Sequence, residues 1–251
     1  MFAISAMFYR EGKIRITNAT FIIWDIFHPL VYLLVFGVGI DAALGVPPGT
    51  GGANYIAFLL GGVLSMASLG VAANTSWSFF MDRDNGIFYE MLTYPMSRAQ
   101  YLGAKVLFNI FLALLAMLIT VGLAAGPLGV AIQWKFFPLL LVGMVGGTAG
   151  WFYFYSIFAL IIRRNDIFNT VTSIFYFVFL FASSMFYPIE PLPVAFRWVA
   201  LANPITWQVD VLRYATIGLG SPGRIALEAA AFAVFTVVSF AVAVRCLERQ
   251  E

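Results

Sequence analysis

The sequence has little charge, one cysteine and one histidine, and each scarcity excludes a class of function. Only 10% of its 251 residues are charged and the net charge is +2, so the charge balance does not favour a nucleic-acid partner. A lone Cys246 cannot form an internal disulfide, and a lone His28 excludes a histidine-based metal cluster. We therefore expect no metal site and no nucleic-acid partner.

The sequence also lacks the motifs of a catalytic protein. Residues 218–225 have the glycine spacing of a phosphate-binding loop, but Arg224 and Ile225 stand where such a loop needs Lys and then Ser or Thr. An enzyme acting within the membrane would need a carboxylate pair, a Ser–His pair or metal ligands there, and we find none of these. We expect no catalytic residue in this chain.

Apolar residues take the place of the missing charge. They make up 62% of the chain and include 26 Phe, a composition typical of an integral membrane protein. A helix needs about 20 mostly apolar residues to cross a bilayer, and six runs qualify. We expect an all-α membrane protein with spans near Phe21–Ile40, Tyr55–Phe80, Tyr101–Ala125, Phe136–Ile162, Ile167–Tyr187 and Ile225–Val244.

The Lys and Arg residues predict the orientation. If both termini face the cytoplasm, ten of the fourteen Lys and Arg residues lie on the inner side and four on the outer side. This bias agrees with the rule that cytoplasmic loops are enriched in positive charge. We expect a multi-pass protein of the plasma membrane, with both termini inside.

Two segments outside the apolar runs are expected to be helical. Residues 1–20 are predicted to form an N-terminal interfacial helix, and 183–223 an outer re-entrant segment. The second segment is apolar but interrupted by prolines, which favours short helices at Val194–Ala202 and Ile205–Ile217 over a full span. The whole chain, 1–251, is predicted to be one transmembrane domain.

The segment 81–98 gathers charge between the second and third runs, so it is expected to leave the membrane on the cytoplasmic side. Its middle part fits two turns of helix ended by Pro95. The helix can rest on lipid headgroups or fill a groove in a cytoplasmic partner. Its apolar face consists of Ile87, Phe88, Met91, Leu92 and Tyr94.

Two capping signals bracket this short helix. Asp84 or Asn85 is expected to cap its start. Ser97 and Gln100 have the spacing of a capping box, which predicts that a new helix begins there and continues into the third span.

Three regions of the chain carry motifs that belong together. They are Tyr9-Arg10-Glu11 with Trp24-Asp25, Pro29 and residues 35–39 (VFGVG); residues 83–98 (RDNGIFYEMLTYPMSR); and residues 186–189 (FYPI) with Leu192-Pro193, residues 203–206 (NPIT) and residues 210–213 (DVLR). In this order, the three regions together resemble the type 2 ABC exporter permeases, closest to the branch of drug exporters and nodulation-factor exporters. Tyr94 precedes the loop proline where the family usually has Ser or Thr.

The resemblance implies how such a chain would work. It would be the permease subunit of an exporter, pair as a dimer in membrane lipid, and bind a separate ATP-binding cassette subunit. ATP and Mg would be bound and used on that partner, so this chain would hold no cofactor itself. The residues implied to couple to the ATP-binding subunit are Gly86, Ile87, Phe88, Glu90, Met91 and Leu92.

The resemblance suggests a substrate class without fixing it. A hydrophobic or amphipathic small molecule, such as a drug or a lipid, is the first expectation, and a glycan or glycolipid is the alternative. A secondary carrier would usually carry charges at mid-membrane or an inverted repeat, and we find neither in spans three to five. A membrane assembly factor without an ATP-binding partner is also a possible function.

Two sets of residues share helix faces within the spans. A stripe on the fifth span is typical of lipid-facing or packed side chains, but the family places this span near the transport path. Glycines four residues apart on the fourth span predict close helix packing. The possible substrate path is Phe168, Thr172, Phe175 and Phe179, continued by Phe186, and the packing set is Gly143, Gly146, Gly147 and Gly150.

Two polar pairs lie outside these sets. Asp25 and His28 lie one helical turn apart in the first span and read as a proton or substrate site or, as we favour, as a polar pair at the cytoplasmic headgroups. Asp210 and Arg213, three residues apart, are expected to form an ion pair that steadies the outer helix.

Overall fold

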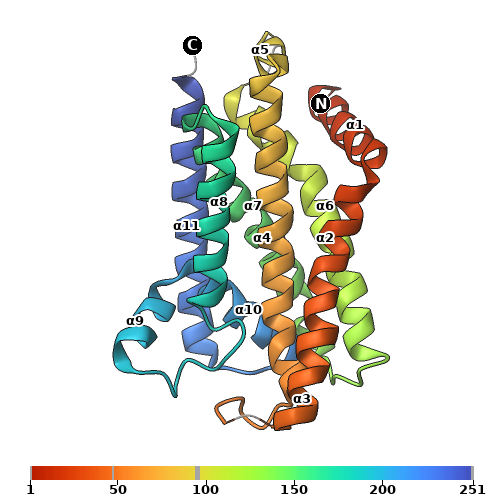
Figure 1. Ribbon diagram of the computed structural model, residues 1–251, viewed down its shortest axis with the longest axis vertical. Coiled ribbons are helices and arrows are strands. Elements are labelled where there is room, and N and C mark those ends of the chain that lie inside the picture. Colours follow the sequence, from red (N-terminus) through yellow and green to blue (C-terminus); the bar gives the residue numbers. More distant parts are fainter. Residues whose placement is uncertain (1, 47, 94–96, 250–251) are drawn as a thin grey trace.

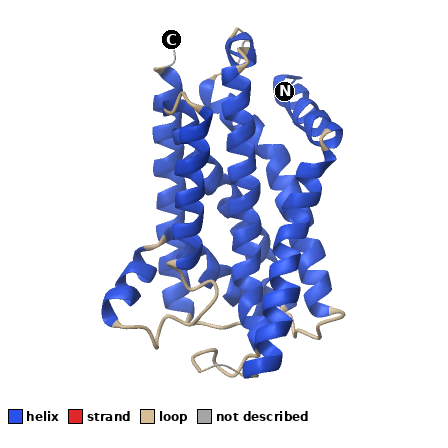
Figure 2. Cartoon of the chain, viewed as in Figure 1, coloured by secondary structure: helices blue, strands red, loops and turns tan. Residues whose placement is uncertain are grey.

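The computed structural model describes residues 2–46, 48–93 and 97–249, and this part of the chain consists of helices joined by loops, without a strand (Figure 2). The long helices run side by side (Figure 1), which confirms the predicted all-α fold. Its helices are α1 (Phe2–Thr17), α2 (Ala19–Val31), the π-helix η1 (Tyr32–Val38), α3 (Gly39–Leu44), α4 (Tyr55–Asp84), α5 (Ile87–Leu92), α6 (Arg98–Ala125), the 3₁₀-helix η2 (Trp134–Phe136), α7 (Phe137–Ile161), α8 (Asn165–Phe181), α9 (Val194–Ala202), α10 (Pro204–Ile217) and α11 (Pro222–Glu248).

Five helices of the described chain are long and apolar enough to cross a membrane. They correspond to the first, second, third, fourth and sixth predicted spans. The fifth, α8, has 17 residues and would be about 25 Å long, less than the roughly 30 Å of a bilayer core. It nevertheless packs against α4 and α7 within the bundle. The count of six spans therefore stays a prediction.

The predicted fifth span, Ile167–Tyr187, is wrong at its C-terminal end because α8 stops at Phe181. The cause is a distant side chain. The Asn203 amide donates to the carbonyl oxygens of Phe179 (3.0 Å) and Ala182 (2.7 Å), and Ser183 Oγ donates to that of Leu180 (2.6 Å). These bonds satisfy carbonyls that a continuing helix would have used.

Helix α4 is the centre of the bundle. Most of its length is buried, and it packs against α2, α6, α7 and α10. Its 30 residues make a helix about 45 Å long, longer than a bilayer core of about 30 Å. The end that carries Asp82 and Arg83 can therefore extend beyond the hydrocarbon.

Both described termini and α5 lie at one end of the bundle, and α3 and α9 lie at the other (Figure 1). This arrangement agrees with the expectation that the termini and the segment 81–98 share one side of the membrane. The helices α9 and α10 confirm the two short helices predicted after Ser183.

The four glycines of α7 have different surroundings within the chain. An added Cβ at Gly143 would lie 2.7 Å from Leu212 Cδ2, and one at Gly147 would overlap the Gln208 amide. At Gly150 it would lie 2.5 Å from Thr236 Oγ1, whereas at Gly146 it would meet no atom within 4 Å. Three of the four glycines thus bring α7 close to α10 and α11, and Gly146 does not.

Candidate functional site

Helix α5 is a short helix set apart by a sharp turn after α4. Gly86 has φ 77°, a left-handed conformation that glycine adopts without the steric cost of a side chain. Gly86 is also the residue that precedes the first helical turn, and no side chain caps that turn. The expectation that Asp84 or Asn85 would cap α5 is therefore wrong.

The predicted apolar face of α5 divides into a buried and an exposed part. Phe88 is fully buried, with its ring centroid 5.6 Å from that of Phe79 and 5.8 Å from that of Tyr101. It fixes α5 to its own chain, so its predicted role as an anchor for a partner is corrected. Ile87 and Tyr89 are exposed. Glu90 is exposed and Met91 half-buried, and the side chains of Leu92 and Tyr94 lie outside the described residues.

The capping box that follows α5 is confirmed. Ser97 Oγ accepts from the Gln100 N–H at 3.2 Å, and Gln100 Oε1 accepts from the Ser97 N–H at 3.0 Å. This reciprocal pair starts α6. Helix α5 thus lies between the turn at Gly86 and the capping box at Ser97.

A buried ion network lies beneath α5. Lys105 is 0% exposed, and its Nζ lies 3.0 Å from Glu11 Oε1 and 2.7 Å from Asp82 Oδ2. Arg10 donates to both carboxylate oxygens of Asp82, at 2.7 and 3.1 Å. Buried charges are tolerated only when they are paired and hydrogen-bonded. The network ties α1 to α4 and α6.

A second polar chain leads from α1 towards the middle of the bundle. The Arg15 guanidinium donates to Asp25 Oδ2 at 3.2 Å, to Asn109 Oδ1 at 3.1 Å and to Thr75 Oγ1 at 3.3 Å. The other carboxylate oxygen of Asp25 accepts from the Asn74 amide. Asp25 is 5% exposed, so its carboxylate lies inside the helix bundle, and its position at the level of the headgroups stays a prediction.

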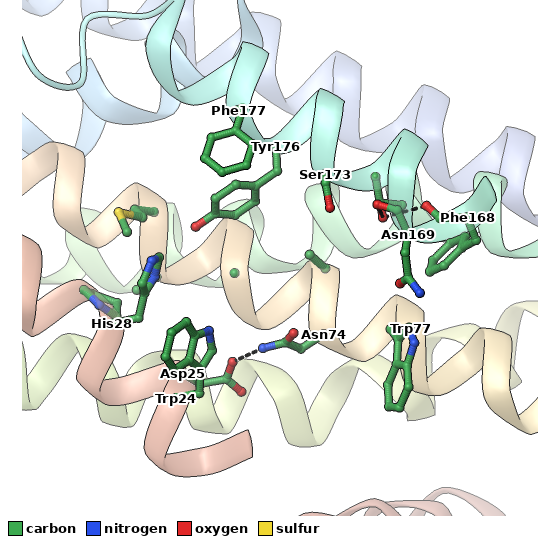
Figure 3. A pocket seen from close by; sticks show the side chains of 16 residues that line it. Trp24, Asp25, His28, Asn74, Trp77, Phe168, Asn169, Ser173, Tyr176 and Phe177 are labelled. Carbon is green, nitrogen blue, oxygen red and sulfur yellow. Dashed lines mark hydrogen bonds between the residues drawn. The ribbon is translucent and has the colours of Figure 1, made fainter. Parts of the chain in front are cut away.

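A pocket of about 390 Å³ lies where α2, α4 and α8 meet (Figure 3). Its polar groups come from all three helices, and aromatic rings surround them. The lining includes the carboxyl group of Asp25, which Arg15 neutralises, and the imidazole of His28, which stacks on Trp24 with centroids 5.2 Å apart. The other labelled lining residues are Asn74, Trp77, Phe168, Asn169, Ser173, Tyr176 and Phe177.

The stripe on α8 separates into two groups. Phe168 and Thr172 line the pocket. Phe175 and Phe179 instead face α7, where both rings contact Phe154 with centroids 5.8 and 5.5 Å away. Neither ring is among the described residues that line this pocket, and the role of Phe175 and Phe179 in a substrate path stays a prediction. A helix carries side chains around its axis, and the sequence alone did not show which part of this face α7 would cover.

The pocket also contains residues that the sequence analysis did not select. Asn74 and Trp77 lie on α4, and Asn169, Ser173 and Tyr176 on α8. One signal for them was present: Asn74 is an amide within an otherwise apolar run, and a polar group inside a membrane helix is a candidate for function.

The opposite end of the bundle carries its own ion network. Arg213 Nη1 donates to Asp210 Oδ1 at 2.9 Å, which confirms the predicted pair. Arg213 also donates to the carbonyl oxygens of Phe58 (3.0 Å) and Ser184 (2.8 Å). Burial lowers the pKa of its guanidinium below the usual value, against the opposing effect of Asp210. These bonds attach α10 to α4 and to the loop after α8.

The sequence matches the model of one protein family, described as ABC-2 type transporter, over residues 3–217. Nodulation protein J of Rhizobium leguminosarum bv. viciae is 24% identical over 237 residues, which cover 91% of this chain and 87% of that protein. Nodulation protein J of Rhizobium leguminosarum bv. trifolii is 26% identical over 234 residues, which cover 89% and 84%. The matched region contains α5, both polar networks of α1 and the pocket, and the family suggested by the sequence motifs is confirmed. The chain therefore belongs to the ABC-2 type transporter family, which forms the membrane permease components of transporters.

Proposed function

We propose that this chain is the permease subunit of an ATP-driven exporter. The observation that carries the proposal is α5, which lies at the same end of the bundle as both termini (Figure 1). Its buried Phe88 holds it to the permease while Ile87 and Tyr89 stay exposed. A small exposed apolar surface of this kind can bind in a groove on a second protein. The partner is an ATP-binding cassette subunit, which binds ATP and Mg and performs the hydrolysis.

The proposed assembly is a homodimer in the plasma membrane, with α5 and both termini in the cytoplasm. The outward faces of α2 and α8, on either side of the pocket, are apolar and exposed. Such faces need either a second copy or lipid. We place the second copy here and membrane lipid around the other helices. The exposed residues include Trp24, Phe27, Ile174, Phe177 and Phe181.

The pocket suits an amphipathic substrate that carries no net charge. Among the described residues of its lining, Asp25 supplies the one carboxylate, which is already paired with Arg15 at 3.2 Å. A cationic substrate would have to compete with this buried pair, and an anionic one would meet no Lys or Arg among the same described residues. Amides, hydroxyls and rings remain to bind the ligand, as is usual for small-molecule pockets.

A glycolipid is the second candidate, and the lining of the pocket favours it over a charged drug. Asn74, Asn169 and Ser173 offer uncharged hydrogen-bonding groups beside the rings of Trp24 and Trp77 (Figure 3). Amides and hydroxyls bond to sugar hydroxyls, and the rings pack on apolar surface.

The experiment is reconstitution of the chain with its ATP-binding subunit in liposomes. We expect the two to co-purify and to move a fluorescently labelled glycolipid across the bilayer only when ATP is present. Transport without the ATP-binding subunit would instead support a secondary carrier. Stable insertion with no such partner and no transport would support an assembly factor.

Pocket variants test where the substrate binds. Asn74→Ala and Trp77→Ala should raise the apparent KM for the labelled glycolipid and leave the basal ATPase rate unchanged, because neither residue lies near α5. The matched control is Asn169→Ala against Thr170→Ala, since both polar side chains lie on α8 but Asn169 lines the pocket and Thr170 is not among the described lining residues. Asn165 is unsuitable because it accepts a hydrogen bond from the Asn169 amide at 3.0 Å. Equal effects of Asn169→Ala and Thr170→Ala would contradict the assignment of the pocket.

A further inference from the structure

One buried side chain, Arg83, ties the end of α4 to the end of α7. Its guanidinium donates to the backbone carbonyl oxygens of Ala159 (2.5 Å), Leu160 (2.8 Å) and Ile162. Arg83 is 9% exposed. These carbonyls lie in and just after the last turn of α7, where few helical N–H groups are left to bond them. A cation at this place is also favoured by the helix dipole.

The same guanidinium is connected to the pocket through two aromatic rings. Arg83 Cζ lies 5.0 Å from the centroid of the Phe80 ring, within the range of a cation–π interaction. The Phe80 ring stacks on Phe168 with centroids 4.9 Å apart and an angle of 15° between planes. Phe168 lies in the first turns of α8 and lines the pocket (Figure 3).

Helix α5 belongs to the same packed unit. Phe88 of α5 contacts Phe79, the neighbour of Phe80 in the sequence. Phe79, Phe80, Phe88 and Phe168 are each 1% exposed or less. Because close-packed interiors transmit a displacement rather than absorb it, α5 and the beginning of α8 are mechanically connected through the end of α4.

We propose that Arg83 is a positioning residue that passes a movement of α5 to the start of α8, and so to the pocket. This inference rests on the proposed function, in which the ATP-binding subunit moves α5. The guanidinium holds the last turn of α7, and Phe80 holds Phe168. The end of α4 therefore cannot shift without moving the connection between α7 and α8, residues 162–164.

A lysine cannot replace Arg83 in this role. A guanidinium is a planar group with five donors, which can bridge several carbonyls and lie over a ring, whereas an ammonium is a single compact charge. Arg83→Lys keeps the charge and loosens the link to α7. Phe80→Leu keeps an apolar side chain and removes the stacking on Phe168. The two variants thus weaken the same connection at different points.

The test uses the complete complex with its ATP-binding subunit in liposomes. Spin labels are attached at Asn85→Cys, in the turn before α5, and at Thr170→Cys on α8, both exposed positions, in a Cys246→Ser background. Labelled chains are diluted with unlabelled ones so that distances within one protomer are measured. The distance between labels is recorded with and without trapped nucleotide, together with the ATPase rate and transport of the labelled glycolipid.

We expect nucleotide to change the distance between the labels in the wild type and in the control variant Arg163→Lys. Arg163 is an exposed arginine that follows Ile162 directly in the sequence. In Arg83→Lys and Phe80→Leu the change should be lost. Transport per ATP hydrolysed should fall at least about tenfold, while assembly and basal ATPase stay within about twofold of the wild type.

Two results would overturn the inference. The first is that Arg83→Lys shows the same nucleotide-dependent distance change, and the same transport per ATP hydrolysed, as the wild type. The other is an equal loss of assembly, ATPase and transport in both variants, because Arg83 would then only hold the fold. Failure of the proposed function looks different: the wild-type chain itself would bind no ATP-binding subunit. A wild-type complex that shows the distance change but moves no glycolipid refutes only the substrate class.

Discussion

Lys105 Nζ lies 2.7 Å from Asp82 Oδ2, and the Lys105 side chain is completely excluded from solvent. Without this lysine, the two buried carboxylates of Glu11 and Asp82 would have to share the guanidinium of Arg10, which leaves buried negative charge incompletely compensated. We predict that Lys105→Met destabilises the protein by about 3 kcal/mol. The change is measured by thermal melting in detergent, in which unfolding is monitored as the loss of the monodisperse peak in size-exclusion chromatography.

The matched control is Arg164→Met. Arg164 also pairs with a carboxylate, Asp166 at 2.6 Å, but both side chains are exposed. Exposed ion pairs contribute little because water screens them. If the two variants lowered the melting temperature equally, the buried network would not be a main support of α1, α4 and α6.

Ile87→Asp tests the surface of α5. Ile87 is 37% exposed, and a carboxylate there would have to be desolvated in an apolar groove. We expect assembly with the ATP-binding subunit to weaken at least tenfold, or about 1.4 kcal/mol. Insertion in the membrane should be unaffected. Pull-down at a series of partner concentrations measures the change.

The control for this variant introduces the same charge at the other end of the bundle. Gly223→Asp adds a carboxylate in the first turn of α11, where a Cβ meets no atom within 4 Å and where the helix dipole favours a negative charge. It should assemble like the wild type. Normal assembly of Ile87→Asp would mean that α5 only rests on the membrane surface.

Cysteine labelling tests the topology. With Cys246 replaced by Ser, a membrane-impermeant maleimide added to intact cells should label Ala195→Cys on α9 and should not label Asn85→Cys in the turn before α5. Both positions are exposed, at opposite ends of the bundle (Figure 1). In permeabilised cells the reagent should label both cysteine positions. The reverse pattern in intact cells would invert the orientation inferred from the Lys and Arg bias.

Two neighbouring glycines of α7 form a matched pair. A methyl group at Gly147 would overlap the Gln208 amide, so Gly147→Ala should lower stability by about 1–3 kcal/mol through overpacking. At Gly146 the added Cβ meets no atom within 4 Å, and alanine there should be neutral or stabilising by up to about 1 kcal/mol. Melting of the two variants in one detergent compares them directly.

The parts of this structure that could be predicted are those that local sequence determines. The capping box at Ser97 and the helix Val194–Ala202 needed only side-chain chemistry within a few residues. The end of α8 could not be predicted in this way, because the amide of Asn203 that stops it comes from 21 residues beyond Ala182.

The candidate site shows the same limit. Periodicity placed Ile87 and Phe88 on one face of α5, whereas the exposure of Ile87 and the burial of Phe88 depend on neighbours such as Tyr101 across a turn. The pocket assembles side chains from α2, α4 and α8, and Asp25 became part of it because Arg15 reaches it from α1. Periodicity can place residues on one face of a helix, but it does not say which neighbour covers that face.

The π-helix η1, which follows Pro29 in the first span, has a practical consequence for experiments on that span. A π-helix bonds each residue to the fifth one along instead of the fourth, so its side chains repeat at a longer interval. Residues before Val31 that share a face are three or four apart, while from Tyr32 to Val38 they are four or five apart. A crosslinking scan with a fixed α-helical step would therefore leave its chosen face at Tyr32, and a change of partner there would reflect helix winding rather than the end of an interface.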